Sequence, residues 1–249
     1  MIDGKRTGCK RTGCKRTGRK WRCRQGAIRV PHGPRLVVMV KQPLLGRVKT
    51  RLARKIGPVA ATFFYRHAVR ALLLRLQGDR RWQTILSVAP DTATGSNVWP
   101  CGLSRVAQGR GDLGARMLRP FERLPPGPLL LIGSDIPQVR PKHIADAFRL
   151  LGGHDAVLGP AEDGGFWLVG MKRRPRLLRP FDGVSWSRAD TMARTLANLE
   201  GHDVCFASVL NDVDAIADFL LLRGWSGRVV QPVALFRSAA STPKPDCDC

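Results

Sequence analysis

The first feature of the sequence that could do chemistry is a cluster of positive side chains early in the chain. Lys41 ends a short apolar run, and Arg47, Lys49 and Arg51 follow in a segment that Gly46 shapes into a loop. Clustered cations repel one another unless an anion neutralises them, so a bound phosphate group is the simplest explanation for this cluster. The alternative is a solvated basic loop. The segment matches neither a Walker loop nor a dinucleotide-binding fingerprint, because the glycine patterns of both are absent.

Isolated carboxylates occupy positions where a metal ion that bridges phosphates could bind. Asp135 follows an apolar run and a Gly-Ser pair, and Asp212 and Asp214 form a second carboxylate pair further along the chain. A hard divalent cation such as Mg²⁺ or Mn²⁺ is bound by one or two carboxylates together with phosphate oxygens. The competing interpretation is that each acid caps the helix that follows it.

Two glycine-rich segments add further candidates. Asp163 precedes Gly164 and Gly165 and then an aromatic run, so the backbone of this turn could approach a ligand closely. Gly-Gly is equally a plain hairpin signal. Arg116 follows a second glycine-rich turn at the expected start of a helix, where the helix dipole favours an anion.

These candidates fall near the ends of apolar runs that alternate with helical stretches. Strands are predicted at 35–41, 83–89, 129–133, 155–159, 166–171 and 204–207, and helices at 58–77, 113–124, 142–151, 188–199 and 213–223. Asp112 is a predicted N-cap, and Ser187 with Asp190 a predicted capping box. The alternation favours an α/β fold with a mainly parallel, twisted sheet covered by helices on both faces. Ligands bind at the carboxyl ends of the strands in such sheets.

The charge of the chain is high, at +23 from 42 Lys/Arg and 19 Asp/Glu. A basic protein suits an anionic ligand, which could be a nucleotide, nucleic acid or anionic lipid. Arginine outnumbers lysine, and genome base composition alone could produce that bias. A nucleic-acid-binding protein is therefore a rival hypothesis, although it leaves the isolated acids near the cations unexplained.

The organisation predicted is one domain, residues 35–224, between two loose ends. Residues 1–34 form a basic arm with a repeated Cys-Lys-Arg-Thr segment, expected to be disordered. The arm could bind nucleic acid or membrane, or come from a short translated DNA repeat or an early start site. Residues 225–249 are expected to be loosely ordered. Seven cysteines without a CxxC pair, and the lack of a bilayer-spanning apolar run, lead us to expect a reduced, cytoplasmic protein.

Six motifs in order, within residues 35–222, resemble a known family: K-Q-P-x-x-G-x-x-K-T-R-L, G-D-L-G-x-R-M, L-I-G-S-D-I-P, G-P-A-E-D-G-G-F-W-L-V-G, V-S-W-S and D-V-D. The series resembles bacterial glycosyltransferase-like proteins labelled radical-SAM/selenodomain-associated transferases, some of which are described as arsenosugar-biosynthesis glycosyltransferases. That family is similar in fold to nucleotide-diphospho-sugar transferases of glycosyltransferase A type. It is also related to the molybdenum-cofactor and phospholactate nucleotidyltransferases.

The resemblance implies a role for each matching residue. The nucleotide phosphates would be held by Lys41, Gly46, Lys49, Thr50 and Arg51. The metal would be held by Asp135, helped by Asp212 or Asp214. The acceptor side would be lined by Asp163, Gly164, Gly165, Trp167 and Trp186, with the two indole rings against a sugar face.

The function predicted is a Mg²⁺- or Mn²⁺-assisted transferase that uses a nucleotide-activated donor and a small-molecule acceptor. A nucleotide-sugar-dependent glycosyltransferase is the first hypothesis, with Asp163 as the candidate acceptor base. A nucleotidyltransferase that forms a nucleoside-diphosphate-linked product is the second, because the same cations could clamp a triphosphate. A nucleic-acid-binding protein and a non-catalytic relative of the transferases are the remaining alternatives.

Overall fold

The computed structural model describes residues 33–173, 176–186 and 188–210. In chain order its elements are β1 (Arg35–Lys41), α1 (Thr50–Ile56), α2 (Pro58–Leu76), β2 (Gln83–Ala89), the short 3-10 helix η1 (Asp91–Ala93), β3 (Ser104–Ala107), α3 (Leu113–Arg123), β4 (Leu129–Ile132), α4 (Pro141–Gly153), β5 (Ala156–Pro160), β6 (Phe166–Met171), α5 (Thr191–Ala197) and β7 (Val204–Phe206).

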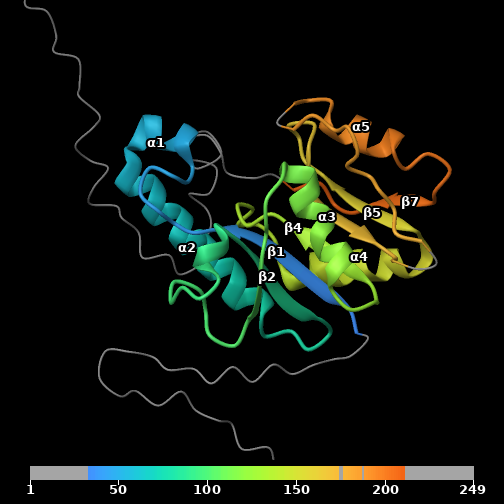
Figure 1. The fold of residues 1–249 in the computed structure, drawn as a ribbon, viewed down its shortest axis with the longest axis horizontal. Helices are drawn as coiled ribbons and strands as arrows, with labels where there is room; N and C mark the ends of the chain where they lie inside the picture. Colours follow the sequence, from blue (N-terminus) through green and yellow to red (C-terminus); the bar gives the residue numbers. More distant parts are fainter. Residues whose placement is uncertain (1–32, 174–175, 187, 211–249) are drawn as a thin grey trace, which may run out of the picture.

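The described strands form one seven-stranded sheet in the order β3-β2-β1-β4-β6-β5-β7 (Figure 1). β1 pairs in parallel with β2 and β4, β2 with β3, and β5 with β7. β6 runs antiparallel to its neighbours β4 and β5. Because β6 is reversed, its first residue Phe166 lies at the same edge of the sheet as the last residues of β1, β2 and β4.

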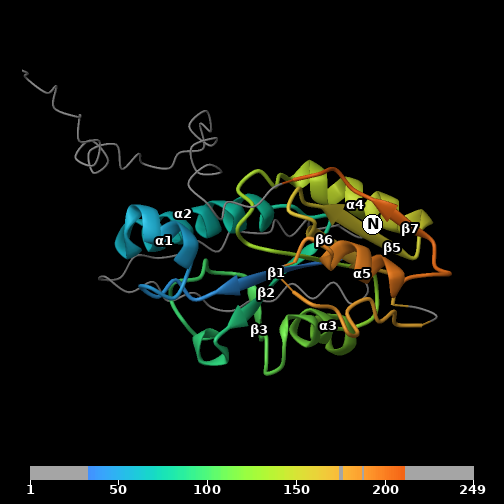
Figure 2. The same ribbon diagram turned by 90° about the horizontal axis from the view of Figure 1, so that it is seen from above.

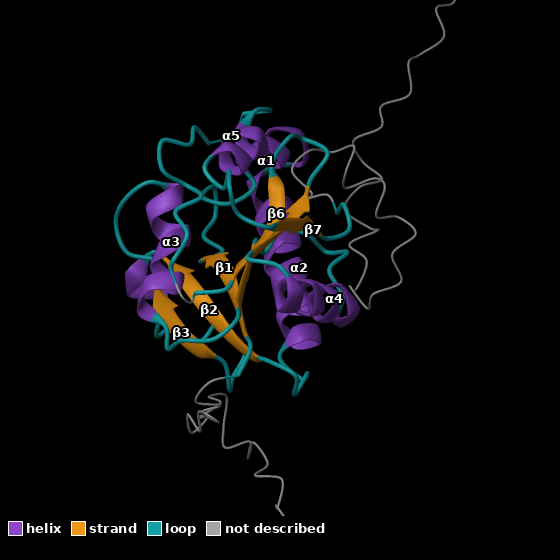
Figure 3. Ribbon diagram, turned by 90° about the vertical axis from the view of Figure 1, so that its right-hand side faces the viewer, coloured by secondary structure: helices purple, strands orange, loops and turns teal. Residues whose placement is uncertain are grey.

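Helices cover both faces of this sheet. Buried residues of α2 and α4, such as Leu72 and Ile144, share one apolar cluster with Leu36 and Val38 of β1. Phe121 of α3 belongs to a second cluster on the opposite face, together with partly buried side chains around α5. Figure 2 shows α2 and α4 on one side of the strands and α3 on the other, and Figure 3 shows the same layers end on. The predicted α/β architecture, with a mainly parallel sheet between helices, is confirmed.

The differences from prediction occur where apolar side chains are few. Neither α1 nor β3 was predicted. Leu52 is the one buried residue of α1, and β3 is a half-exposed edge strand. Asp112 caps α3 as predicted, with its carboxylate accepting from the Ala115 amide at 2.8 Å.

The helix predicted from residue 188 begins later in the structure, and Ser187 of the predicted capping box lies outside the described residues. Helix α5 begins at Thr191, and its N-cap Asp190 makes no capping hydrogen bond. The Asp190 carboxylate instead accepts from the guanidinium groups of Arg188 and Arg194, at 3.1 and 2.7 Å. The predicted helix at 213–223, most of the basic arm and the C-terminal tail lie outside the described residues. Within the described part of the chain, no helix combines the length and apolar content needed to cross a membrane.

Candidate functional site

An open cleft of about 610 Å³ lies along the edge of the sheet where β1, β2 and β4 end and β6 begins. Five positively charged residues line it: Lys41, Arg47, Lys49, Arg51 and Arg116. Among the described lining residues there is one carboxylate, that of Asp135. The cleft is therefore a strongly positive environment, which is suited to a polyphosphate.

The Lys49 ammonium and the Asp135 carboxylate form an ion pair in this cleft. Lys49 Nζ lies 3.0 Å from Asp135 Oδ2, although the two residues are 86 positions apart in the sequence. The Lys49 side chain is 5% exposed and that of Asp135 is 34% exposed. A buried ammonium is costly without a partner, so Asp135 stabilises the inward position of Lys49.

The loop after β1 places Lys49 in this position. The Arg47 amide donates to the Leu44 carbonyl at 3.0 Å and closes a turn. Gly46 is the third residue of that turn and has φ +70°, a conformation that glycine adopts readily. Lys49 is the N-cap of α1 and also has a left-handed backbone, with φ 46° and ψ 48°. The loop thus turns sharply twice before α1 begins.

Tyr65 of α2 forms part of the cleft wall beside this pair and was not anticipated from the sequence. Its hydroxyl accepts from the Lys41 amide at 3.0 Å, donates to the Lys41 carbonyl at 3.1 Å and lies 3.3 Å from Ser134 Oγ. Burial is the main cause that raises the pKa of Tyr65, so the hydroxyl stays protonated. These bonds join the end of β1 to the segment after β4. The one available signal was that Tyr65 is the only tyrosine of the chain, on an otherwise apolar helix face.

Gln108, which follows β3, supports the other side of the cleft and was also missed. Its side chain is buried, and its amide nitrogen donates to the carbonyls of Val40 and Ser87 at 3.2 and 2.9 Å. Its amide oxygen accepts from the Arg116 guanidinium at 3.4 Å. Arg116 also donates to the Asp112 carbonyl at 3.2 Å, so that two acceptors orient it at the start of α3.

The turn that carries Asp163 connects β5 to β6. The Asp163 carboxylate is exposed and accepts from the Gly165 amide at 2.9 Å. Gly164 has φ +82°, and a Cβ atom there would lie 2.1 Å from the Ala189 carbonyl oxygen. Its own carbonyl accepts from the Met192 amide of α5 at 3.0 Å. Glycine is required at 164 by close backbone packing, and this turn does not line the cleft described above.

The two tryptophans predicted on the acceptor side differ in their surroundings. Trp167 lines the cleft but is 3% exposed, and its indole N–H donates to the Ser208 carbonyl at 2.9 Å. Trp186 packs against Phe166 and Phe181, with ring centroids 6.5 and 5.9 Å apart. Phe166 itself lines the cleft, so Trp186 supports the wall from behind.

The described cleft therefore brings together one group of the predicted site residues: Lys41, Lys49, Thr50, Arg51, Arg116, Asp135 and Trp167. A second group does not line it: Gly46, Asp163, Gly164, Gly165 and Trp186. Asp212 and Asp214 lie outside the described residues.

A divalent metal ion would have Asp135 as its ligand from the described part of this cleft. No group of three or more His, Cys, Asp or Glu side chains that could hold a metal occurs among the residues that the structure describes. Mg²⁺ commonly uses one or two carboxylates and takes its remaining ligands from water and substrate phosphates. Asp135 beside the positively charged loop that carries Lys49 and Arg51 fits a metal of that kind.

Comparisons with known proteins agree with this fold. Residues 72–188 match the profile of a family described as "Uncharacterized protein conserved in bacteria (DUF2064)". The crystal structure of a provisionally assigned nucleotide-diphospho-sugar transferase from Desulfovibrio desulfuricans G20 is 29% identical, with a TM-score of 0.71 over 83% of this chain and 94% of that one. No curated protein matches the chain.

Two nucleotidyltransferase structures share the fold at low identity. A nucleotidyl transferase from Methanothermobacter is 14% identical, with a TM-score of 0.52 over 77% of this chain and 96% of that one. The inositol-1-phosphate CTP transferase from T. maritima is 12% identical, with a TM-score of 0.51 over 74% and 90%. The chain has the nucleotide-diphospho-sugar transferase fold.

Proposed function

We propose that this protein is a transferase that uses a nucleotide-activated donor and that the group it transfers is a sugar. The observation that carries the proposal is the cleft in which Lys49 meets Asp135 among four further cations. The similarity to the Desulfovibrio protein, provisionally assigned as a nucleotide-diphospho-sugar transferase, supports a sugar nucleotide as the donor.

The cations would act on the diphosphate of the donor. Negative charge grows on the phosphates as the bond to the sugar breaks, and fixed positive groups in a partly enclosed cleft stabilise that charge. Lys49 and Arg51 flank Thr50 at the start of α1, and Arg116 faces the same cleft from α3. A metal ion held by Asp135 and the phosphates would supply further Lewis-acid stabilisation. Asp163 has an exposed carboxylate shortly before the cleft residue Phe166, and it is the candidate base for an acceptor bound at the rim of the cleft.

Nucleotidyl transfer is the second candidate, and the charge of the cleft favours it. Among the described residues that line the cleft, five cations face one carboxylate, and that carboxylate already pairs with Lys49. A nucleoside triphosphate carries more negative charge than a nucleoside diphosphate sugar and would neutralise more of the remaining cations. The same side chains would then clamp the triphosphate for in-line attack by an acceptor.

One assay separates these two reactions. The full-length protein is incubated with Mg²⁺ or Mn²⁺, with a panel of nucleotide sugars and nucleoside triphosphates as donors, and with small-molecule acceptors that carry hydroxyl, phosphate or carboxylate groups. The released products are then measured. Release of a nucleoside diphosphate from a nucleotide sugar supports glycosyl transfer, and release of pyrophosphate from a triphosphate supports nucleotidyl transfer. The Asp135→Asn variant is the background control. A protein that yields neither product with any donor contradicts both candidates.

A further inference from the structure

The Lys49–Asp135 ion pair raises a question about the order in which ligands enter the cleft. Asp135 is the carboxylate that a metal would need, yet its Oδ2 atom already lies 3.0 Å from the Lys49 ammonium. A divalent cation bound to the same carboxylate would be only a few ångströms from that ammonium. At such a separation like charges repel strongly in a partly buried site. A metal ion that bound Asp135 would therefore compete with the Lys49 ammonium for this carboxylate.

The backbone of Lys49 shows that its position is set by the site. Among the described residues, Lys49 is the one non-glycine residue with a positive φ, at 46°. A long side chain in that region of backbone space is uncommon and is retained where the surrounding structure imposes it. Thr50 begins α1 immediately afterwards. The backbone thus turns at Lys49, and its side chain reaches Asp135 in the cleft.

A phosphate would offer Lys49 an alternative partner. Lys49 and Asp135 both line the cleft, together with Arg51, Tyr65 and Ser134. A lysine ammonium forms short, charge-assisted hydrogen bonds with phosphate oxygens, as it does with a carboxylate. When the Lys49 ammonium moves from the Asp135 carboxylate to a phosphate oxygen, Asp135 becomes available to a cation that binds the same phosphates.

We propose that Lys49 occupies Asp135 in the nucleotide-free protein, so that the divalent metal binds well only after a nucleotide has drawn Lys49 away from the carboxylate. This inference deepens the proposed function and rests on its nucleotide-binding cleft. It predicts that metal and nucleotide each strengthen the binding of the other, because such coupling is reciprocal.

The direct test measures the binding of Mn²⁺ alone, by electron paramagnetic resonance of the free ion, to the folded full-length protein. The Lys49→Met variant keeps the length and apolar stem of the side chain but removes the charge. We expect it to bind Mn²⁺ about tenfold more tightly than the wild type, a factor typical of coupling between two sites. Lys49→Arg keeps the charge and should bind Mn²⁺ as weakly as the wild type.

Lys41→Met is the matched control, because Lys41 lines the same cleft and its loss removes the same charge. If Lys41→Met and Lys49→Met raise the affinity for Mn²⁺ by the same factor, the general field of the cleft explains the gain and the proposed competition is wrong. The double variant Lys49→Met/Asp135→Asn should lose the gain. A gain that persists without the Asp135 carboxylate would also overturn the proposal.

A second measurement uses inorganic pyrophosphate, which presents a diphosphate without choosing a base. Calorimetry in the presence of EDTA should show that pyrophosphate binds the wild type and binds Lys49→Met more weakly. Equal affinity of the two proteins for pyrophosphate would show that Lys49 does not bind phosphate and would refute the exchange.

The Mn²⁺ experiment needs no donor, so it also separates this proposal from the proposed function. If Lys49→Met binds Mn²⁺ more tightly but no nucleotide binds the protein, the competition for Asp135 stands and the proposed function is contradicted.

Discussion

At the scale of single residues, Asp163 can be tested without disturbing the turn that holds it. One carboxylate oxygen accepts from the Gly165 amide, and an asparagine at 163 would keep an oxygen in that place. If Asp163 is the acceptor base, Asp163→Asn should lower kcat by about a hundredfold or more, since asparagine cannot take a proton. Urea unfolding should give a stability close to that of the wild type. An unchanged kcat would remove Asp163 from the chemistry and leave it the role of a turn residue.

The residue scale also shows what sequence reasoning could find. Lys49 and Asp135 were identified because charged side chains stand out after apolar runs. The left-handed backbone of Lys49 could not be predicted, since nothing in a lysine favours it. Tyr65 and Gln108 were missed for a different reason. Their polar ends bind main-chain atoms of β1 and β2, and those partners become visible only when the strands are placed side by side.

At the scale of elements, the N-cap residue of α3, Asp112, affects both the stability of the helix and the position of Arg116 in the cleft. Asp112 accepts from the Ala115 amide, and its carbonyl accepts from Arg116. Asp112→Ala should lower the free energy of unfolding by about 1 kcal/mol, which is typical for a lost cap. It should also raise the KM for the donor, because Arg116 lies in the same first turn. Asp112→Ser keeps a capping oxygen and should restore most of the stability. A Ser variant as unstable as the Ala variant would argue against the cap.

Two glycines allow the β5–β6 turn to be compared with the loop that follows β1. Gly46 and Gly164 both have positive φ, but a Cβ atom at 46 would meet nothing within 4 Å, whereas one at 164 would clash with the Ala189 carbonyl. Gly46→Ala should therefore cost about 1–2 kcal/mol, the strain of a left-handed residue. Gly164→Ala should cost clearly more, because the backbone near α5 must also move. Chemical denaturation of both variants measures the difference, and equal losses would show that the turn relaxes freely.

The same scale explains which elements could be predicted. The bounds predicted for β1, β2 and β6 agree with the structure because each is an apolar run buried between two helical layers. Helix α1 was not predicted because basic side chains cover much of its surface and Leu52 is its one buried residue, so the helix has no apolar pattern. The reversed direction of β6 could not be read from its sequence, because a strand buried on both faces has the same composition in either direction.

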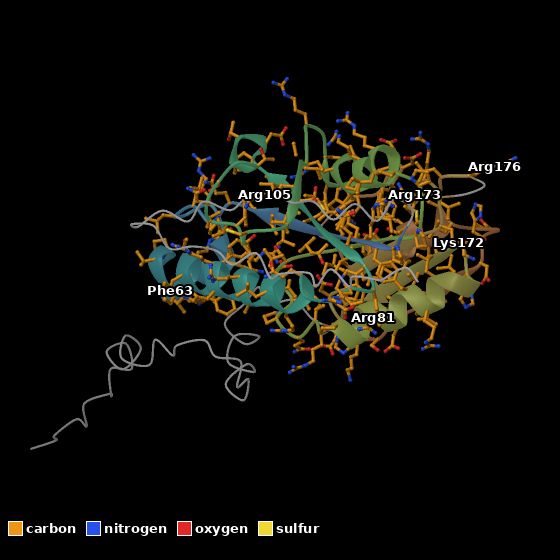
Figure 4. The ribbon with its side chains drawn as sticks, turned by 90° about the horizontal axis from the view of Figure 1, so that it is seen from below. Phe63, Arg81, Arg105, Lys172, Arg173 and Arg176 are labelled. Atoms are coloured by element: carbon orange, nitrogen blue, oxygen red, sulfur yellow. The ribbon has the colours of Figure 1, made fainter. Side chains whose placement is uncertain are left out.

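At the scale of the whole molecule, part of the high positive charge serves the fold. Arg173 donates to the carbonyls of Gly127 and Leu124, and Arg105 donates to those of Thr94 and Ser96. In Figure 4, Lys172, Arg173 and Arg176 lie together at the end of the molecule opposite Phe63 of α2. This end is remote from the cleft, because β6 begins at the cleft edge and ends at Met171. Arginines that bind main-chain carbonyls contribute to the net charge without forming a nucleic-acid surface.

The positions of the basic residues allow a transferase to be distinguished from a nucleic-acid-binding protein. Residues 1–25 carry ten Lys/Arg and one acid, whereas the cleft cations all belong to the described domain. Deletion of residues 1–25 should leave donor turnover unchanged. It should weaken binding to a mixed-sequence DNA duplex and reduce the dependence of that binding on salt, because fewer counterions are released. A full-length variant with glutamine at these ten basic positions controls for chain length. If turnover fell in both proteins in step with DNA affinity, the basic arm would be part of the enzyme's substrate site, and the cleft alone would not account for function.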